Sequence, residues 1–185
     1  ASLGQFDLQL IDPILLGKMY VVPGGVSDLN STGGLGGSLH MESNGADTSF
    51  HGGVEFNAYS TRGFRSAANM SYGKGKWSGQ TALFTRRDRN EFQYFVPGEG
   101  DLKQTMGSAQ IEGAGFSQSL QYSGRDKLKF KGNVLYSQLK RELPTVLYVP
   151  DPQDAQYDRI AAADFSFRKD IGAKWTIESA AGYQQ

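Results

Sequence analysis

The chain has no cysteine, which excludes disulfides and thiolate metal sites. It also lacks long apolar runs, since no stretch approaches the roughly 18 residues of a membrane-spanning helix. Neither sign of charge prevails: 19 Lys and Arg match 19 Asp and Glu, and no basic run with interleaved aromatics indicates nucleic-acid binding. The mean hydropathy of −0.45 excludes a helical membrane bundle but not a β-barrel, whose strands are half polar.

The clearest periodic stretch lies between residues 124 and 142, after a polar corner at 124–127. From residue 128 to 138 apolar or small side chains alternate with polar ones, and Leu135 is the one exception. A period of two predicts a strand. At about 3.4 Å per residue this run reaches about 37 Å, enough to cross a hydrocarbon layer of about 30 Å when tilted. Because the run at 116–123 alternates in the same way, the pair has the pattern of a membrane-spanning β-hairpin.

The same alternation recurs along the chain and predicts an all-β fold with about seven long antiparallel strands. The further strands are expected at 50–60, 64–73, 77–87, 159–169 and 174–184, of which 77–87 alternates less cleanly. Connections at 73–76, 124–127 and 170–173 are short, whereas those at 88–114 and 142–158 are long. Alternation of short and long connections is typical of outer-membrane barrels, which have small periplasmic turns and large extracellular loops.

The period of two also assigns residues to faces. We expect one set to face lipid: Phe56, Ala58, Phe64, Met70, Leu120, Tyr122, Phe130, Val134, Tyr136, Phe165, Phe167 and Ile177. We expect a second set to face the lumen of a barrel or a plug inside it: Glu55, Asn57, Arg65, Asn69, Ser119, Lys129, Lys131, Asn133 and Ser166. Four rings lie near the short turns, which predicts an aromatic girdle at one interface: Tyr72, Trp77, Tyr122 and Trp175.

The first residues read as a separate small unit. Two apolar stretches, Phe6 to Ile11 and Ile14 to Val22, are expected to form strands, with a further short strand at 38–43. Between them, residues 23–37 are rich in glycine and small polar residues. This stretch contains neither GxxxxGK[ST] nor GxGxxG before a helix, so it is not interpreted as a phosphate-binding loop.

Val22 to Met41 resembles the end of the plug domain of TonB-dependent outer-membrane receptors, a pattern like EVLRGxxSxLYGSGALGGxINI before the barrel. The matching positions are Val22, Gly24 or Gly25, Ser27, Leu29, Gly33, Leu35, Gly36, Gly37, Leu39 and Met41. The departures are Tyr20 for the usual Glu, Pro23 for Arg, and Asn30-Ser31 for Tyr-Gly, so an ion pair made by that Glu and Arg in relatives is not carried over. The turn at 73–77, the stretch Asn90-Glu91-Phe92 and Arg141 to Pro144 also resemble the barrel strands of such receptors.

The resemblance implies a plug tail at 1–46, followed at 49–185 by the first strands of a transmembrane β-barrel of about 22 strands. An open sheet in lipid leaves backbone groups unpaired at several kcal/mol each, so we expect the rest of the barrel outside this sequence. It further implies a receptor in the bacterial outer membrane that imports a scarce ligand of the ferric siderophore, haem or cobalamin type. Its partners would be membrane lipid, a small-molecule or metal-chelate ligand, and the TonB complex through a segment outside this sequence.

Two groups are candidates for ligand contact: Arg86, Arg87 and Arg89 where the strand at 77–87 ends, and the aromatic Phe92, Tyr94 and Phe95 in the long connection that follows. A solvated rim and an upper aromatic belt are the alternative interpretations. His40 and His51 are the only histidines and no cysteine accompanies them, so we expect no metal site, no cofactor and no enzymatic activity. The rival classes are a passive porin-like channel, which needs no glycine-rich plug motif, and a soluble β-sandwich binding module, which has short strands.

Overall fold

A computed structural model describes residues 8–23, 37–42, 49–96, 98, 102–105, 109–125, 127–143, 154–171 and 175–185. In this part of the chain the secondary structure is strands and two short 3₁₀ turns, with no α-helix, which confirms the predicted all-β class. The glycine-rich motif from Gly24 to Gly36 lies outside the described residues, as does the expected boundary after residue 46.

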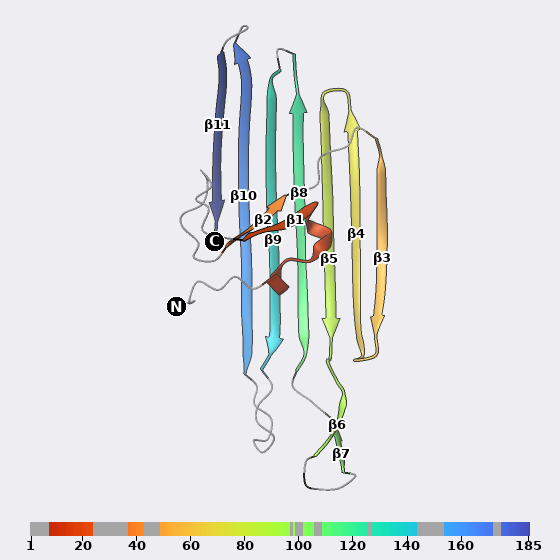
Figure 1. Ribbon diagram of the computed structural model, residues 1–185. Helices are drawn as coiled ribbons and strands as arrows, with labels where there is room; N and C mark the ends of the chain where they lie inside the picture. The colour runs from red at the N-terminus through yellow and green to blue at the C-terminus, as the bar shows by residue number, and fades with distance from the viewer. Residues whose placement is uncertain are drawn as a thin grey trace.

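A seven-stranded antiparallel sheet dominates the molecule, and each long strand pairs with the next one along the chain (Figure 1). Its strands are β3 (His51–Tyr59), β4 (Gly63–Lys74), β5 (Trp77–Asp88), β8 (Ile111–Ser123), β9 (Lys129–Glu142), β10 (Ala155–Ile171) and β11 (Trp175–Gln184). The prediction of seven long antiparallel strands is therefore confirmed, with β3 and β11 at the two edges.

The connections differ in length at the two ends of the sheet. The short turns after β4, β8 and β10 lie at one end, called here the short-turn end (upper in Figure 1). The connections between β5 and β8 and between β9 and β10 lie at the other, the long-loop end. The first carries a small hairpin of β6 (Gln93–Phe95) and β7 (Lys103–Thr105) that the sequence pattern did not predict. Between β3 and β4 the long-loop end has a tight turn, so the alternation of short and long holds only from β4 onward.

The N-terminal unit comprises η1 (Leu8–Leu10), η2 (Pro13–Leu15), β1 (Lys18–Pro23) and β2 (Gly37–Glu42). β1 and β2 pair antiparallel, which confirms the strand expected at 38–43. The strand expected over Phe6 to Ile11 is wrong where the structure describes it, and the second expected strand begins only at Lys18. For the late start of the second strand the reason is local: the carboxylate of Asp12 accepts a hydrogen bond from the Ile14 amide at 3.1 Å, and Pro13 occupies the first helical position of η2.

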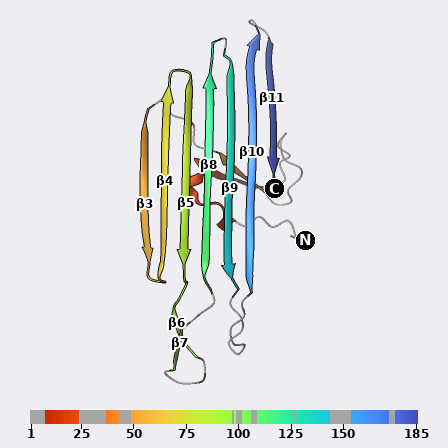
Figure 2. The same cartoon turned by 180° about the vertical axis from the view of Figure 1, so that it is seen from behind.

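This unit lies on one face of the sheet, in front of it in Figure 1 and behind it in Figure 2. We call this the covered face and the opposite side the free face. Directly paired residues of antiparallel strands point to the same side, so the register assigns every strand residue to a face. All residues expected to face lipid lie on the free face, and all those expected to face a lumen or plug lie on the covered face. The division into two sets is confirmed, while the medium that each face contacts stays a prediction.

Candidate functional site

The N-terminal turns pack on an apolar patch of the covered face. Leu10 and Ile11 form one buried cluster with Leu139 of β9 and Ile160 of β10. Leu15 forms a second cluster with three covered-face residues, Ala67, Ala82 and Phe84. Leu135 packs against both clusters and so joins them. The otherwise polar covered face is therefore apolar where the segment from Gln9 to Leu16, called here the docking segment, lies against it.

This patch was not predicted from the sequence, although the sequence contains a signal for it. Leu135 is the one exception to the alternation over 128–138, and Phe84 is an apolar residue on the polar side of the strand that alternates less cleanly. Both interruptions mark positions where the covered face meets the docking segment. Gly115, opposite Phe84 on β8, leaves room for the Phe84 ring, because a Cβ at this position would lie 2.7 Å from that ring. An interruption of the two-residue period on the polar side thus indicates the contact.

One ion pair joins the docking segment to the sheet. Arg65 of β4 donates from Nε and Nη2 to the two carboxylate oxygens of Asp12, at 2.7 and 2.5 Å. Its third nitrogen, Nη1, donates to Glu55 of β3 at 2.7 Å. The side chains of Asp12 and Arg65 are only 5% and 14% exposed, whereas that of Glu55 is 58% exposed. The bidentate geometry fixes both the position and the orientation of the segment.

The surroundings of Asp12 favour its charged form. Burial alone would raise the pKa of its carboxyl, but the hydrogen bonds from Arg65 and the Ile14 amide and the charges of Arg65 and Arg86 outweigh burial. The pKa of Asp12 therefore lies below its ordinary value. The carboxylate is ionised across the neutral range, and it serves at once as helix cap and as ion-pair partner.

The remaining polar contacts of the docking segment run mostly to its main chain. The hydroxyl of Ser137 donates to the carbonyl of Leu10, and that of Ser117 donates to the carbonyl of Leu15 at 3.2 Å. Two arginines reach Gln9: Arg86 donates to its carbonyl and Arg141 to its side-chain oxygen, both at 3.4 Å. The hydroxyls of Ser137 and Ser117 thereby satisfy main-chain carbonyls in buried and part-buried surroundings, whereas the two contacts to Gln9 are exposed.

The structure separates the candidate ligand residues instead of gathering them. Arg86 and Arg87 are neighbours in a strand, so they point to opposite faces: Arg86 contacts the docking segment, while Arg87 pairs with Glu112 on the free face at 3.0 Å. Arg89 lies beyond the end of β5 and pairs with Glu91 at 3.8 Å. Three arginines from one short stretch thus have three different surroundings.

The three aromatic candidates lie together in and before the β6–β7 hairpin. Phe92 and Phe95 are exposed, at 45% and 58%. The Tyr94 hydroxyl donates to Gln104 at 3.0 Å, and the ammonium group of Lys103 lies 5.2 Å from the centre of the Phe95 ring. This hairpin therefore presents rings and a cation at the long-loop end, away from the docking segment (Figure 1).

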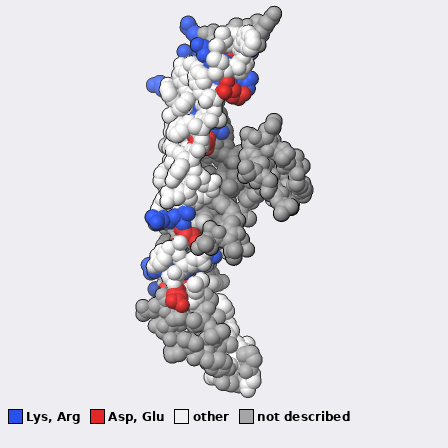
Figure 3. All heavy atoms as spheres, turned by 90° about the vertical axis from the view of Figure 1, so that its left-hand side faces the viewer, with Lys and Arg blue, Asp and Glu red and all other residues white. Residues whose placement is uncertain are grey.

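The free face carries a continuous band without charge. On β4, β5, β8 and β9 the band covers residues 64–72, 77–85, 114–122 and 130–138, respectively. Within these ranges no charged side chain points to the free face. Each range spans about 27 Å at about 3.4 Å per residue, close to the apolar band of about 25 Å on membrane barrels. Figure 3, with the free face at its left, shows uncharged surface between two groups of Lys and Arg.

Large apolar side chains of this band are open to the surroundings: Phe56 is 78% exposed, and Phe64, Leu83 and Phe165 are 50% exposed or slightly more. Among the described residues, no segment covers this face. At the short-turn end the centres of the Trp77 and Tyr122 rings lie 4.8 Å apart; that these rings belong to a girdle at a membrane interface stays a prediction.

Three polar side chains within the band, from β4, β5 and β8, bond to one another. The Thr81 hydroxyl donates to the side-chain oxygen of Gln118 at 2.6 Å, and the amide nitrogen of Gln118 donates to the Tyr72 hydroxyl at 3.0 Å. Polar groups placed in an apolar medium need such partners. The network therefore suits a surface that faces hydrocarbon.

Within the described ranges, three or more His, Cys, Asp or Glu side chains nowhere gather as a metal site would require. The helical turns in that part of the chain are also too short to cross a membrane. His51 begins β3 on the covered face, paired with Ser71. No protein-family model matches the chain, and no curated protein matches it significantly.

Proposed function

We propose that this chain forms the end of the plug and the first wall strands of a TonB-dependent outer-membrane receptor. The observation that supports this most strongly is the difference between the faces of one sheet. The free face carries an uncharged band about 27 Å tall, whereas the covered face is polar and binds the N-terminal unit through Asp12 and Arg65. A lipid-facing wall with a plug in its lumen accounts for both faces at once.

Energetics favour lipid on the free face. Soluble proteins rarely leave contiguous apolar patches larger than a few hundred Å² open to water, and the rings of this band extend over every strand from β3 to β11. In lipid the same side chains are in a favourable medium, and every backbone polar group must be paired within the protein. Further strands pairing with the edges of β3 and β11 would close the wall.

The resemblance of Val22 to Met41 to a plug end is the basis for the transport role. The intact receptor would bind a ferric siderophore, haem or cobalamin type of ligand and import it with energy from the TonB complex. The ligand would meet the exposed rings Phe92 and Phe95 at the long-loop end. Arg86 is engaged by Gln9, so we place it with the plug contact and not with the ligand.

These 185 residues contain no cysteine, so a single cysteine introduced into them gives a direct test in the full-length protein once any cysteine outside them is replaced by serine. A fluorophore attached to Val134→Cys, on the free face, should be quenched strongly by a quencher carried on lipid acyl chains. The same fluorophore on Asn133→Cys, one residue away on the covered face, should be quenched little. Equal quenching at both positions, or labelling of Val134→Cys by a water-soluble reagent, would contradict the proposal.

The rival classes predict different results in the same test. In a soluble β-sandwich, Val134→Cys would be buried by protein and neither lipid quencher nor aqueous reagent would reach it. A passive channel would show the lipid exposure of Val134 but would pass its solute without energy from the TonB complex. Ligand uptake measured with and without that complex separates a receptor from such a channel.

A further inference from the structure

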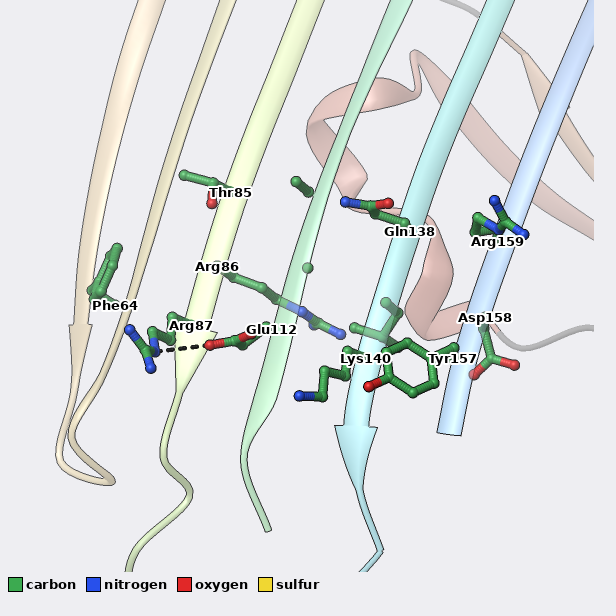
Figure 4. A pocket seen from close by; sticks show the side chains of 13 residues that line it. Phe64, Thr85, Arg86, Arg87, Glu112, Gln138, Lys140, Tyr157, Asp158 and Arg159 are labelled. Atoms are coloured by element: carbon green, nitrogen blue, oxygen red, sulfur yellow. Dashed lines mark ion pairs between the residues drawn. The ribbon is translucent and has the colours of Figure 1, made fainter. Parts of the chain in front are cut away.

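A hollow of about 690 Å³ opens at the long-loop edge of the uncharged band. Its charged lining on the free face consists of Arg87, Glu112, Lys140 and Arg159, drawn in Figure 4. The rings of Phe64 and Tyr157 stand at its two sides. Basic and aromatic side chains thus meet where the band ends.

The register shows how this lining is ordered. Phe64, Arg87, Glu112, Lys140 and Tyr157 are successive cross-strand neighbours and form one row across β4, β5, β8, β9 and β10. Arg159 belongs to the next row toward the band, opposite Gln138. Arg87, Glu112 and Lys140 are the first charged residues beyond the band on their strands, whereas Arg159 lies level with the last uncharged row of the band.

Cations exceed carboxylates in this hollow. Glu112 forms an ion pair with Arg87. The carboxylate of Asp158 points to the covered face, where it pairs with Arg141 at 3.0 Å. Lys140 lies over the Tyr157 ring, 5.7 Å from its centre. Within the described part of the chain, no acidic side chain forms an ion pair with Lys140 or Arg159. Two cations are therefore available to an anion from outside.

We propose that this hollow binds the phosphate-bearing headgroup of a membrane lipid, a proposal that rests on the membrane-wall function given above. Lys140 and Arg159 bind the phosphate at the boundary, where Arg provides planar paired donors and Lys a point charge. The acyl chains lie on the band beside them, over Leu83, Phe116 and Tyr136, which form the adjoining uncharged row. Cations next to an apolar surface are the general means by which proteins hold anionic lipids.

Charge complementarity selects this occupant over others. A free inorganic phosphate would make the same contacts with Lys140 and Arg159 but would gain nothing from the apolar band. A zwitterionic lipid would cover the band but would bring a cation of its own into a hollow that already has an excess of cations. Only a lipid whose phosphate gives it a net negative charge contacts both the two cations and the apolar band favourably.

The test uses the full-length protein, purified in an uncharged detergent, with lipid A and its dephosphorylated form as matched probes. Binding is read by native mass spectrometry and by the rise in melting temperature. The variant Lys140→Gln/Arg159→Gln removes both charges and keeps the side-chain stems. It should bind phosphorylated lipid A about 30-fold more weakly, taking the usual contribution of a basic residue near an anionic surface for each position. Lys140→Arg/Arg159→Lys should bind as the native protein does.

The matched control is Lys74→Gln/Lys169→Gln, which removes two cations from the free face at the short-turn end. It should leave binding unchanged. Unchanged binding in Lys140→Gln/Arg159→Gln, equal binding of the dephosphorylated probe, or full competition by millimolar inorganic phosphate would each overturn the headgroup site. A fluorophore on Val134→Cys in the same preparation separates the two proposals: if lipid quenches it while the headgroup test fails, the wall function stands and only this site is lost.

Discussion

At the scale of single residues, Asp12 has two structural roles, one in the fold of the docking segment and one in its attachment to the sheet. Its carboxylate caps η2 through the Ile14 amide and receives both donors of Arg65. Local folding of the docking segment and its attachment to the sheet therefore depend on one charge. Glu55, the second partner of Arg65, is exposed and contributes less, because water screens its attraction.

Replacement of Asp12 by Asn should loosen the docking segment while keeping its shape. Breaking a buried ion pair costs about 3–5 kcal/mol, and we expect the lower end, about 3, because Arg65 retains Glu55. Hydrogen exchange at the amides of Leu15 and Leu16, which bond to Asp12 and Pro13 carbonyls, would report the change. Glu55→Gln is the control and should cost under about 1 kcal/mol. Equal effects of the two substitutions would refute the assignment.

The docking segment should also respond to acid. Since the pKa of Asp12 is lowered in the folded protein, its contribution is complete above the ordinary carboxyl range and is lost as the pH falls through the lowered pKa. Spin labels at Lys18→Cys and Asn57→Cys should keep one distance between pH 7 and about 5 and give a broad distribution in stronger acid. Addition of Asp12→Asn should abolish this transition; a transition at neutral pH would contradict the assignment.

Individual residues also explain what the sequence could and could not predict. The two faces of β9 followed from alternation, because a strand turns each successive side chain to the opposite side. Leu135 was recognised as an exception without a reason, since its partner Leu10 lies far away in the chain. A long-range contact of this kind is visible in the sequence only as an interruption of the alternation, which does not identify the partner residue.

At the scale of elements, β9 offers the sharpest comparison of the two faces. Val134→Arg places a cation in the middle of the uncharged band and should destabilise the inserted protein by roughly 2–4 kcal/mol, the usual cost near a bilayer midplane. Asn133→Arg adds the same side chain on the covered face beside Asp164, to which Asn133 donates at 2.6 Å, and should be far milder. Unfolding of the protein from lipid vesicles in urea measures both. Similar costs would indicate that both faces meet the same medium.

The connection between β5 and β8 should be dispensable for the sheet but not for the ligand. β5 and β8 pair directly as far as Asp88 and Ile111, and the described residues of 92–109 make their backbone hydrogen bonds within the connection itself, so the sheet ladder does not depend on them. Replacing 92–109 by a short Gly-Ser linker should leave membrane insertion intact and weaken ligand binding to cells. Replacing the turn at 124–127 by a linker is the control. Unchanged ligand binding would show that the β6–β7 hairpin is not part of the binding surface.

The exact ends of the strands could not be predicted from the local sequence pattern. The seven long strands were placed correctly, yet β10 begins at Ala155, inside a connection expected to run to residue 158. Its first residues, Ala155 to Asp158, are held by pairing with β9 up to Glu142, and pairing partners are not visible in a single strand. The β6–β7 hairpin was missed for a related reason, because three-residue strands are too short to show a period.

At the scale of the whole molecule, the arrangement is one large sheet whose polar face is partly covered by the N-terminal unit. Sequence alternation predicted two faces, but the place where the N-terminal unit attaches followed only from the structure. That unit touches β4, β5, β8, β9 and β10 through two turns of three residues each. A short segment thus spans most of the sheet.

Removal of residues 1–46 should change permeability before it changes insertion. The sheet is held by its own ladders, so the wall should still form in the full-length background, while the lumen loses the unit on its covered face. We expect faster entry of a bulky antibiotic into cells and loss of energy-dependent ligand uptake. The control is the linker replacement of 92–109, which should not increase leakage. Unchanged leakage after removal would contradict a plugged barrel.

The order of contacts along the docking segment has a mechanical consequence. From its N-terminal side, Gln9 meets Arg141, Leu10 meets Ser137, Asp12 meets Arg65 and Leu15 meets Ser117. A pulling force applied ahead of Gln9 would load these contacts one after another, as in peeling, and not all together, as in shear. The rupture force would then be set by the strongest single contact, the buried ion pair of Asp12, and the segment would yield in steps.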